Sequence, residues 1–348
     1  MRIALDAMGG DHAPGPIVAG AAQAALAQPE LIVHLVGDRD RIEAELAKIA
    51  DAPRDRLPIV HASEVIGMEE KPVEALRKKR DNSISVCWGL MAKGEVQAVV
   101  SAGNTGAMVA SALFNAKMFL PGVRRPGIAA IYPSHLGPVA IVDVGANMNP
   151  KPEDLYQYGV MGSVYAERVL GVAQPGIGIL NVGSEEDKGT DLIRATRALF
   201  LDSKMKDRFV GYVEGRDIHD GRARVIVCEG FTGNILLKSG EGAVEFLFGA
   251  LKQEMAKLLP MIPAEAGQRL IGGLKELKSR FEYQEFGGGP LLGIRGACII
   301  CHGSSGDRAI KNAIRVAGVM AADDVGREIV SRLADAPKSH PQPNATNV

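Results

Sequence analysis

The sequence predicts an α/β protein with a doubly wound, mostly parallel sheet. Short β-branched runs alternate with longer helical patterns. Several of these runs are apolar throughout, as is typical of strands that helices cover on both faces. Glycine-rich loops follow the runs, at the points where parallel strands pass into helices. Aromatic residues are only 5% of the 348 residues, so we expect a core of Ala, Val, Ile and Leu.

The expected elements alternate along residues 1–335, which we predict to form a single α/β catalytic domain. Strands are expected at 3–6, 31–36, 58–61, 97–101, 139–144, 176–182, 209–213, 223–228 and 297–301. Helices are expected at 16–28, 39–49, 83–93, 105–119, 153–170, 187–201, 234–259 and 305–333. Two segments break the alternation. Residues 258–281 form a candidate interfacial helical segment, and residues 336–348, with three prolines, are expected to be a disordered tail.

Charge and composition exclude some classes of protein. The 40 basic and 41 acidic residues give a net charge of −1, which excludes a nucleic-acid binder that relies on bulk positive charge. Asp6 interrupts the first apolar run, so we expect no secretory signal, and no uncharged stretch is apolar enough to span a membrane. Four cysteines without an export signal are typical of reduced thiols, so we expect a cytoplasmic protein.

Five glycine-rich loops are the most informative feature of the sequence. They occupy residues 5–12, 101–106, 142–147, 181–185 and 229–234. If the strands before them are parallel, the loops converge on one crevice, where the first N–H groups of several helices can bind an anion. We therefore expect a phosphate-bearing substrate. The alternative is that the loops are only tight turns between strand and helix.

The common fingerprints of other classes are absent. The sequence has no G-x-G-x-x-G after a strand, no P-loop, no G-x-S-x-G elbow and no H-E-x-x-H. Cys298, Cys301 and His302 spell C-x-x-C-H, but haem attachment of this type accompanies export, and the two intervening isoleucines indicate a buried strand. The sequence therefore predicts no cofactor and no metal.

Seven stretches resemble the bacterial acyl-ACP:phosphate acyltransferase family, PlsX. They are DAMGGDHAP at 6–14, HASEVI at 61–66 with EKP at 70–72, SAGNTGA at 101–107, DVGAN at 143–147, LNVGSEEDKG at 180–189, GFTGNILLK at 230–238 and HGSS at 302–305. The resemblance implies attack of inorganic phosphate on the thioester of a long-chain acyl group carried by acyl carrier protein, which yields acyl phosphate for phospholipid synthesis. It also implies a homodimer with a fold like that of the phosphotransacetylase and isopropylmalate dehydrogenase group.

The expected site residues combine this resemblance with positions at strand ends. Lys188, Asn234 and His61 are the catalytic candidates. The candidates for binding phosphate or substrate are Asp6, Gly9, Gly10, Gly103, Asn104, Thr105, Gly106, Asp143, Asn147 and Gly233. Structural alternatives remain for several of them. Lys188 can be a solvated lysine, Asn234 a helix cap, and the two aspartates and Asn147 can lock their loops by hydrogen bonds.

The expected partners are acyl carrier protein, a second copy of the chain and a membrane surface. Acyl carrier protein is acidic, so its docking face should be basic. The candidates are residues 77–80, Arg124 with Arg125, and the group Lys275, Lys278 and Arg280. Leu258, Leu259, Met261 and Ile262 are candidate contacts for peripheral attachment to a membrane. The alternative is that they pack at a dimer interface.

Three other functions compete with this prediction. They are a phosphotransacetylase that uses CoA, a dehydrogenase on a related fold, and a non-catalytic adaptor for a carrier protein or a membrane. The absent dinucleotide fingerprint disfavours the dehydrogenase.

Overall fold

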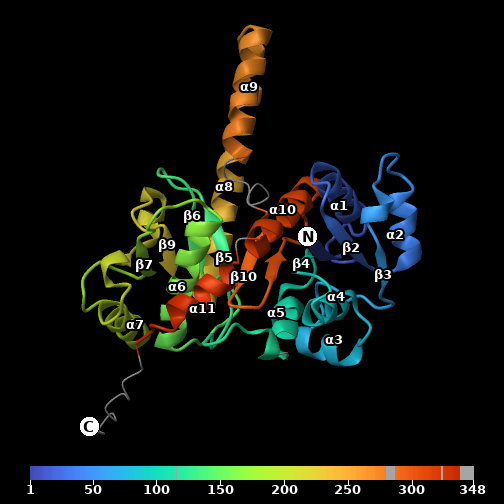
Figure 1. The fold of residues 1–348 in the computed structure, drawn as a ribbon. Coiled ribbons are helices and arrows are strands. Elements are labelled where there is room, and N and C mark those ends of the chain that lie inside the picture. Colours follow the sequence, from blue (N-terminus) through green and yellow to red (C-terminus); the bar gives the residue numbers. More distant parts are fainter. Residues whose placement is uncertain (115, 280–286, 323, 338–348) are drawn as a thin grey trace.

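The computed structural model describes residues 1–114, 116–279, 287–322 and 324–337 (Figure 1). Its centre is an 11-stranded sheet with the order β3-β2-β1-β4-β11-β10-β5-β6-β9-β7-β8. The strands are β1 (Arg2–Asp6), β2 (Ile32–Gly37), β3 (Ile59–His61), β4 (Ala98–Ser101), β5 (Gly127–Tyr132), β6 (Val139–Val142), β7 (Ile177–Leu180), β8 (Phe209–Val213), β9 (Val225–Val227), β10 (Gly289–Leu292) and β11 (Ala297–Ile300).

The sheet consists of two parallel blocks that run in opposite directions. The first block is β3-β2-β1-β4-β11, and the second is β6-β9-β7-β8. Between them lie three antiparallel pairings, β11 with β10, β10 with β5, and β5 with β6. Because an odd number of reversals separates the blocks, their carboxyl ends lie at opposite edges of the sheet.

Helices cover both faces of the sheet, as the apolar strands predict. The helices are α1 (Gly15–Ala27), α2 (Arg39–Leu46), α3 (Pro72–Lys78), α4 (Ser83–Ala92), α5 (Thr105–Phe114), α6 (Pro152–Arg168), α7 (Asp191–Leu201), α8 (Gly230–Leu258), α9 (Ala264–Ser279), α10 (Asp307–Ala322) and α11 (Val325–Leu333), with short 3-10 turns η1 (Arg54–Arg56), η2 (Ala116–Met118), η3 (Lys206–Arg208), η4 (Gly215–Asp220) and η5 (Leu259–Met261). Successive residues of β1 belong to different cores: Ile3 and Leu5 pack in one, and Ala4 packs in the other.

The predicted helix 305–333 is wrong in one respect, because it is two helices. Asp324 has a left-handed backbone, with φ of 49°, and its side chain accepts a hydrogen bond from the Arg327 N–H at the start of α11. A left-handed residue cannot continue a helix, so α10 ends before it. The short helix α3 was not expected, whereas α9 lies within the segment 258–281 that was expected to be helical.

Helices α8 and α9 project from the body of the protein (Figure 1). Within the 29 residues of α8 only Gly230 and Gly233 are buried. The two helices meet at η5, where Gly267 of α9 lies so close to Leu259 that an added Cβ would sit 3.0 Å from its Cδ2. Among the helices of the described residues, none is both long and apolar enough to cross a membrane.

The cysteines of the C-x-x-C-H sequence lie in the core. Cys298 is in β11 and Cys301 directly follows it; both are buried free thiols. Burial raises the pKa of the Cys301 thiol to about 12 and also raises that of Cys298. Arg280 and residues 338–348 of the predicted tail lie outside the described residues.

Candidate active site

The glycine-rich loops form two separate groups, so the prediction of one crevice is wrong. The loops after β1 and β4 leave the edge of the first block, and those after β6, β7 and β9 leave the opposite edge. Strands β1 and β6 are five positions apart in the sheet, which corresponds to about 24 Å at the usual strand spacing. Within one chain, the two groups cannot bind the same orthophosphate.

At the edge of the first block, the predicted binding residues lock the loops to one another. The carboxylate of Asp6 accepts a hydrogen bond from the Ser101 hydroxyl at 2.7 Å. The Asn104 amide donates to the carbonyls of Gly67, Met68 and Glu70, each at 3.1 Å, and its oxygen accepts from the Ala107 N–H at the start of α5. The contacts of Asp6 and Asn104 therefore agree with the structural alternative, in which these side chains lock their loops by hydrogen bonds.

The glycines of this edge allow two backbones to cross. A Cβ on Gly9 would lie 2.5 Å from the Gly103 nitrogen, so no larger residue fits there. Gly10 has a φ of 112°, which favours glycine, and lies against the Gly303 carbonyl. Thr105 is exposed, and Gly106 packs against Pro72 of α3.

His61 does not share a site with the other catalytic candidates within this chain. It ends β3, the outermost strand of the first block, and is exposed. Its Nδ1 accepts a hydrogen bond from the Arg39 N–H at 3.4 Å. Seven strand positions, about 34 Å, separate β3 from β6.

At the edge of the second block, Asp143 organises the loop after β6. Its buried carboxylate accepts hydrogen bonds from the backbone N–H groups of Ile128, Gly145, Ala146 and Asn147 at 2.6 to 3.2 Å. Burial raises the pKa of Asp143, and these hydrogen bonds oppose the rise. The Asn147 amide donates to the Pro126 carbonyl at 2.7 Å. Asp143 and Asn147 therefore hold the loop in one conformation.

The first turn of α8 packs directly on this loop. The Gly230 N–H donates to the Asn147 carbonyl at 2.8 Å, and a Cβ on Gly233 would lie only 2.0 Å from the Asp143 carbonyl oxygen. This contact places the Asn234 side chain against Gly145, whose added Cβ would lie 3.9 Å from the Asn234 Nδ2. Among the described residues, no group forms a hydrogen bond with the Asn234 amide, so it can act as a donor to a ligand.

Glu229 occupies the anion-binding position that the sequence predicts at the start of α8. Its carboxylate accepts hydrogen bonds from the N–H groups of Phe231 and Thr232, at 2.6 and 2.9 Å, and from the Thr232 hydroxyl. We did not expect this role for Glu229. The signal was present, because an acidic residue directly before a helix commonly caps it and interacts favourably with its dipole.

Lys188 lies in the loop between β7 and α7. The Asn181 amide donates to the Gly183 carbonyl at 3.0 Å, and the Lys188 N–H donates to the Glu185 carbonyl at 3.1 Å. An added Cβ on Gly183 would lie 3.3 Å from the Lys188 Cγ. Lys188 is exposed, and in the described part of the chain its ammonium makes no ion pair, so its charge is available to an anion.

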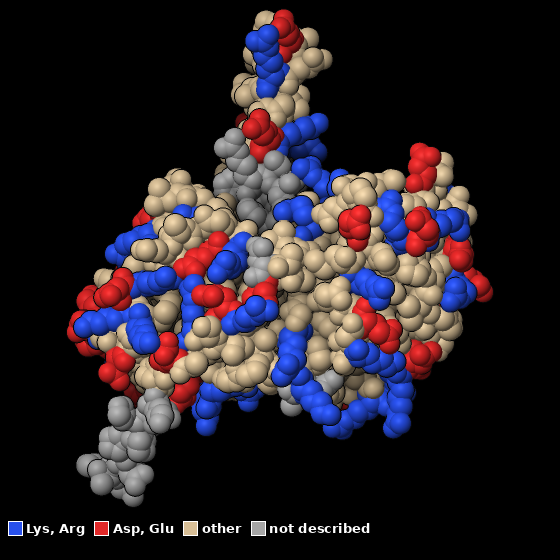
Figure 2. Space-filling view, in the orientation of Figure 1, with Lys and Arg blue, Asp and Glu red and all other residues tan. Residues whose placement is uncertain are grey.

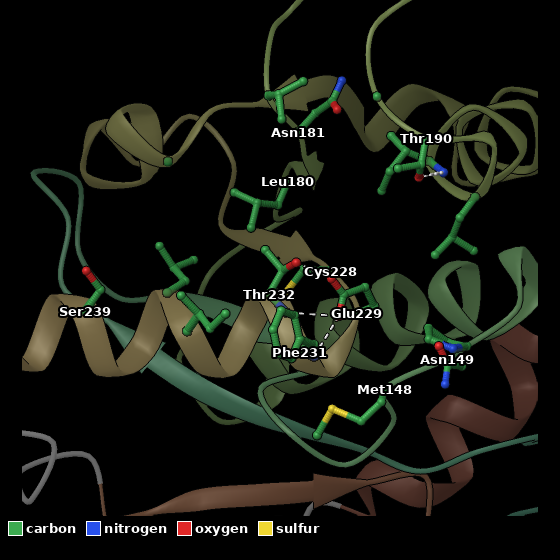
Figure 3. A pocket seen from close by; sticks show the side chains of 18 residues that line it. Met148, Asn149, Leu180, Asn181, Thr190, Cys228, Glu229, Phe231, Thr232 and Ser239 are labelled. Carbon is green, nitrogen blue, oxygen red and sulfur yellow. Dashed lines mark hydrogen bonds between the residues drawn. The ribbon is translucent and has the colours of Figure 1, made fainter.

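A pocket of about 890 Å³ lies between this loop and α8 (Figure 3). Asn181 and Thr190 lie on one side of it, and Phe231 and Thr232 lie on the other. Lys188 directly precedes lining residues of the loop, and Asn234 directly precedes Ile235 in the lining of the helix. Neither side chain lines the pocket itself, whose wall includes Glu229, so the cation and the amide adjoin the lining along the chain and are candidates to hold an oxyanion or a phosphate.

Comparison with known proteins identifies the family. The "Fatty acid synthesis protein" family matches residues 1–328. The chain is 49% identical over 319 residues to the phosphate acyltransferase of Desulforamulus reducens, covering 91% of this chain and 92% of the relative. It is 49% identical over 322 residues to that of Heliobacterium modesticaldum, covering 91% and 93%, and 44% identical over 336 residues to that of Geotalea daltonii, covering 96% and 95%.

Solved structures with low sequence identity share the fold. A phosphotransacetylase from Streptococcus pyogenes matches with a TM-score of 0.58 at 16% identity, covering 92% of this chain and 94% of that one. A 4-hydroxythreonine-4-phosphate dehydrogenase from Klebsiella pneumoniae matches with a TM-score of 0.52 at 14% identity, covering 92% and 99%. The predicted α/β fold of the phosphotransacetylase type is confirmed. The family match and the sequence relatives place the chain in the fatty acid synthesis protein family, as a member of its phosphate acyltransferases, PlsX.

Proposed function

We propose that this protein transfers a long-chain acyl group from acyl carrier protein to inorganic phosphate. The observation that carries the proposal is the 49% identity to phosphate acyltransferases over 91% of the chain. The pocket whose lining adjoins Lys188 and Asn234 along the chain supports it, because the reaction needs a cation for phosphate and a donor for the thioester oxygen.

The reaction needs no nucleophile from the protein. A phosphate oxygen attacks the thioester carbon, the C–O bond forms, and the C–S bond breaks with its electron pair on sulfur. The thiolate leaves as carrier protein and takes a proton, and acyl phosphate remains. Lys188 holds the phosphate by its point charge. The Asn234 amide donates to the oxyanion that develops on the carbonyl.

Trapping of the acyl phosphate tests this function. The purified protein is mixed with acyl thioester, inorganic phosphate and hydroxylamine, and the hydroxamate is measured. We expect a phosphate-dependent hydroxamate that forms faster from the carrier-protein thioester than from the CoA thioester. A preference for CoA would indicate the phosphotransacetylase alternative, and the absence of phosphate-dependent hydroxamate from either thioester would indicate an adaptor.

The projecting helices support peripheral membrane attachment of a cytoplasmic enzyme. Leu258 is 52% exposed and Met261 is 80% exposed, whereas Leu259 and Ile262 face Gly267 of α9. Of the four predicted membrane contacts, Leu258 and Met261 are therefore the two that face outward.

Flotation with anionic liposomes tests this attachment. Leu258→Glu with Met261→Glu should abolish flotation and leave acyl transfer in solution unchanged. Dimerisation is the alternative use of this surface. If flotation persists in the double variant and sedimentation shows a monomer where the wild type is a dimer, the segment is a dimer interface.

A further inference from the structure

The pocket beside Lys188 and Asn234 has an apolar wall that the transfer of a phosphate alone does not require. Loop and strand residues form one side of it, and one face of α8 forms the other. The apolar lining residues on these two sides include Leu180, Val182, Phe231, Ile235 and Leu236, and Ile193 at the start of α7. Phosphate is fully polar, so this lining indicates a second, apolar part of the substrate.

The apolar side chains at the rim are unusually exposed. Val182 is 81% exposed, Phe231 is 60% exposed and Ile235 is 53% exposed, and all three line this one pocket. Exposed apolar area that gathers at one place is typical of a binding site rather than of a solvated surface. Burial of these side chains by an apolar ligand would remove them from water, which is favourable.

The shape of the lining indicates a chain rather than a compact ring. Phe231, Ile235 and Ser239 are spaced by four residues, so they lie on one face of α8. The strip from the first to the last of them is about 12 Å long at the helical rise. Asn234 lies near the start of α8, at the Phe231 end of this strip, and Ser239 lies at the other end of the strip (Figure 3).

We propose that this pocket binds the hydrocarbon chain of the acyl thioester, with the thioester at the Asn234 end and the methyl end toward Ser239. The inference rests on the proposed function. It adds where the acyl chain of the substrate binds, and the length of that part of the pocket determines the preferred acyl-chain length. Each methylene that leaves water strengthens binding about fourfold, so two methylenes change kcat/KM about 15-fold until the pocket is filled.

The first test is a binding measurement that does not depend on turnover. The neutral apolar fluorophore N-phenylnaphthylamine is bound to the full chain and displaced with hexadecanol. Ile235→Glu, which places a carboxylate in the apolar strip, should weaken displacement by hexadecanol at least tenfold. Leu26→Glu is the matched control, because Leu26 is 50% exposed on α1, outside the pocket, and this variant should bind as the wild type does. Equal binding by wild type and Ile235→Glu overturns the proposal.

The second test measures chain-length preference. Ser239 is exposed on α8, so Ser239→Trp can fill the far end of the pocket without disturbing the core. The variant should lower kcat/KM for the longest acyl carrier protein thioesters at least tenfold relative to kcat/KM for short ones. An unchanged profile contradicts the proposal, even if Ile235→Glu does not fold.

The two proposals fail in different ways. If hexadecanol binding depends on Ile235 but no acyl phosphate forms, the proposed function is wrong and the apolar site stands. If acyl phosphate forms and neither variant changes the profile or the binding, the function stands and the site for the chain is elsewhere.

Discussion

At the scale of single residues, the candidate site depends on two side chains that structural contacts leave available. Asn234 packs on Gly145 without a hydrogen bond to its amide from the described residues, and Lys188 is exposed in the loop between β7 and α7. Asp143 and Asn147, by contrast, use their polar atoms to hold the loop between them. Residues whose polar atoms are free can therefore contact a substrate, whereas residues whose polar atoms bind the loop position it.

Replacement of either available residue should reduce turnover. We expect Lys188→Ala and Asn234→Ala each to lower kcat for acyl transfer about a hundredfold, because each removes one preorganised donor or charge from the reacting atoms. Circular dichroism and the midpoint of thermal unfolding should match the wild type. Lys206→Ala, an exposed lysine of η3, is the control. Turnover near the wild-type value in both site variants would exclude these roles.

The buried carboxyl group of Asp6 should make the stability of the protein depend on pH. Burial raises its pKa above 3.8, although hydrogen bonds from Ser83 and Ser101 oppose the rise. Between about pH 4 and the raised pKa, the native protein holds more protons than the unfolded chain, so this group makes the free energy of unfolding fall as pH rises.

The Asp6→Asn variant lacks this titration. The free energy of unfolding of the wild type minus that of Asp6→Asn should therefore decrease as pH rises from about 4. Urea unfolding at several pH values measures the difference. A difference that is constant, or that increases with pH, would mean that Asp6 is not the buried carboxyl described above.

At the scale of elements, the first turn of α8 positions the site. Gly233→Ala should lower the free energy of unfolding by about 2–3 kcal/mol, because its Cβ would overlap the Asp143 carbonyl. Gly242 offers a matched control in the same helix, since nothing lies within 4 Å of an added Cβ there. Gly242→Ala should stabilise the helix by about 0.5–1 kcal/mol. Equal effects of the two substitutions would contradict the packing of α8 on the loop after β6.

Two strands that the sequence did not predict, β5 and β10, explain why the prediction of one common crevice is wrong. The alternation of apolar runs and helical patterns correctly predicts nine strands near their observed positions. It misses β5, which begins with Gly127 and contains two alanines, and β10, which contains Gly289 and Pro290. These residues have low β-propensity, and pairing with neighbouring strands stabilises them in the sheet. Because these two strands reverse the direction of the sheet, their omission leads directly to the wrong expectation that all five loops meet.

At the scale of the whole molecule, the direction of the two blocks decides where a carrier protein can dock. Lys and Arg gather around α3 and α5 (Figure 2), but α3 begins beside Gly106, at the edge of the first block. Arg124 and Arg125 instead precede Pro126, whose carbonyl binds Asn147 at the edge of the second block. Arg124 is held by buried Asp154 at 2.9 Å, and Arg125 is exposed. We propose that acyl carrier protein docks beside Arg125.

Charge reversal distinguishes the two basic surfaces. Arg125→Glu should raise KM for the acyl carrier protein thioester about tenfold at low salt with little change in kcat, and added salt should reduce the difference. Arg77→Glu in α3 should leave KM within twofold of the wild type. The reverse result would place the docking face at α3.

The proposed reaction requires that phosphate binds at the edge of the second block, between Lys188 and Asn234. A crystal structure with bound arsenate tests it most directly, because arsenic is located by its anomalous scattering. We predict an arsenic peak at a position from which the arsenate oxygens accept hydrogen bonds from the Lys188 Nζ and the Asn234 Nδ2. A peak against Gly9, Gly10 and Gly103 at the opposite edge, or no peak at a saturating concentration of arsenate, would exclude this phosphate site.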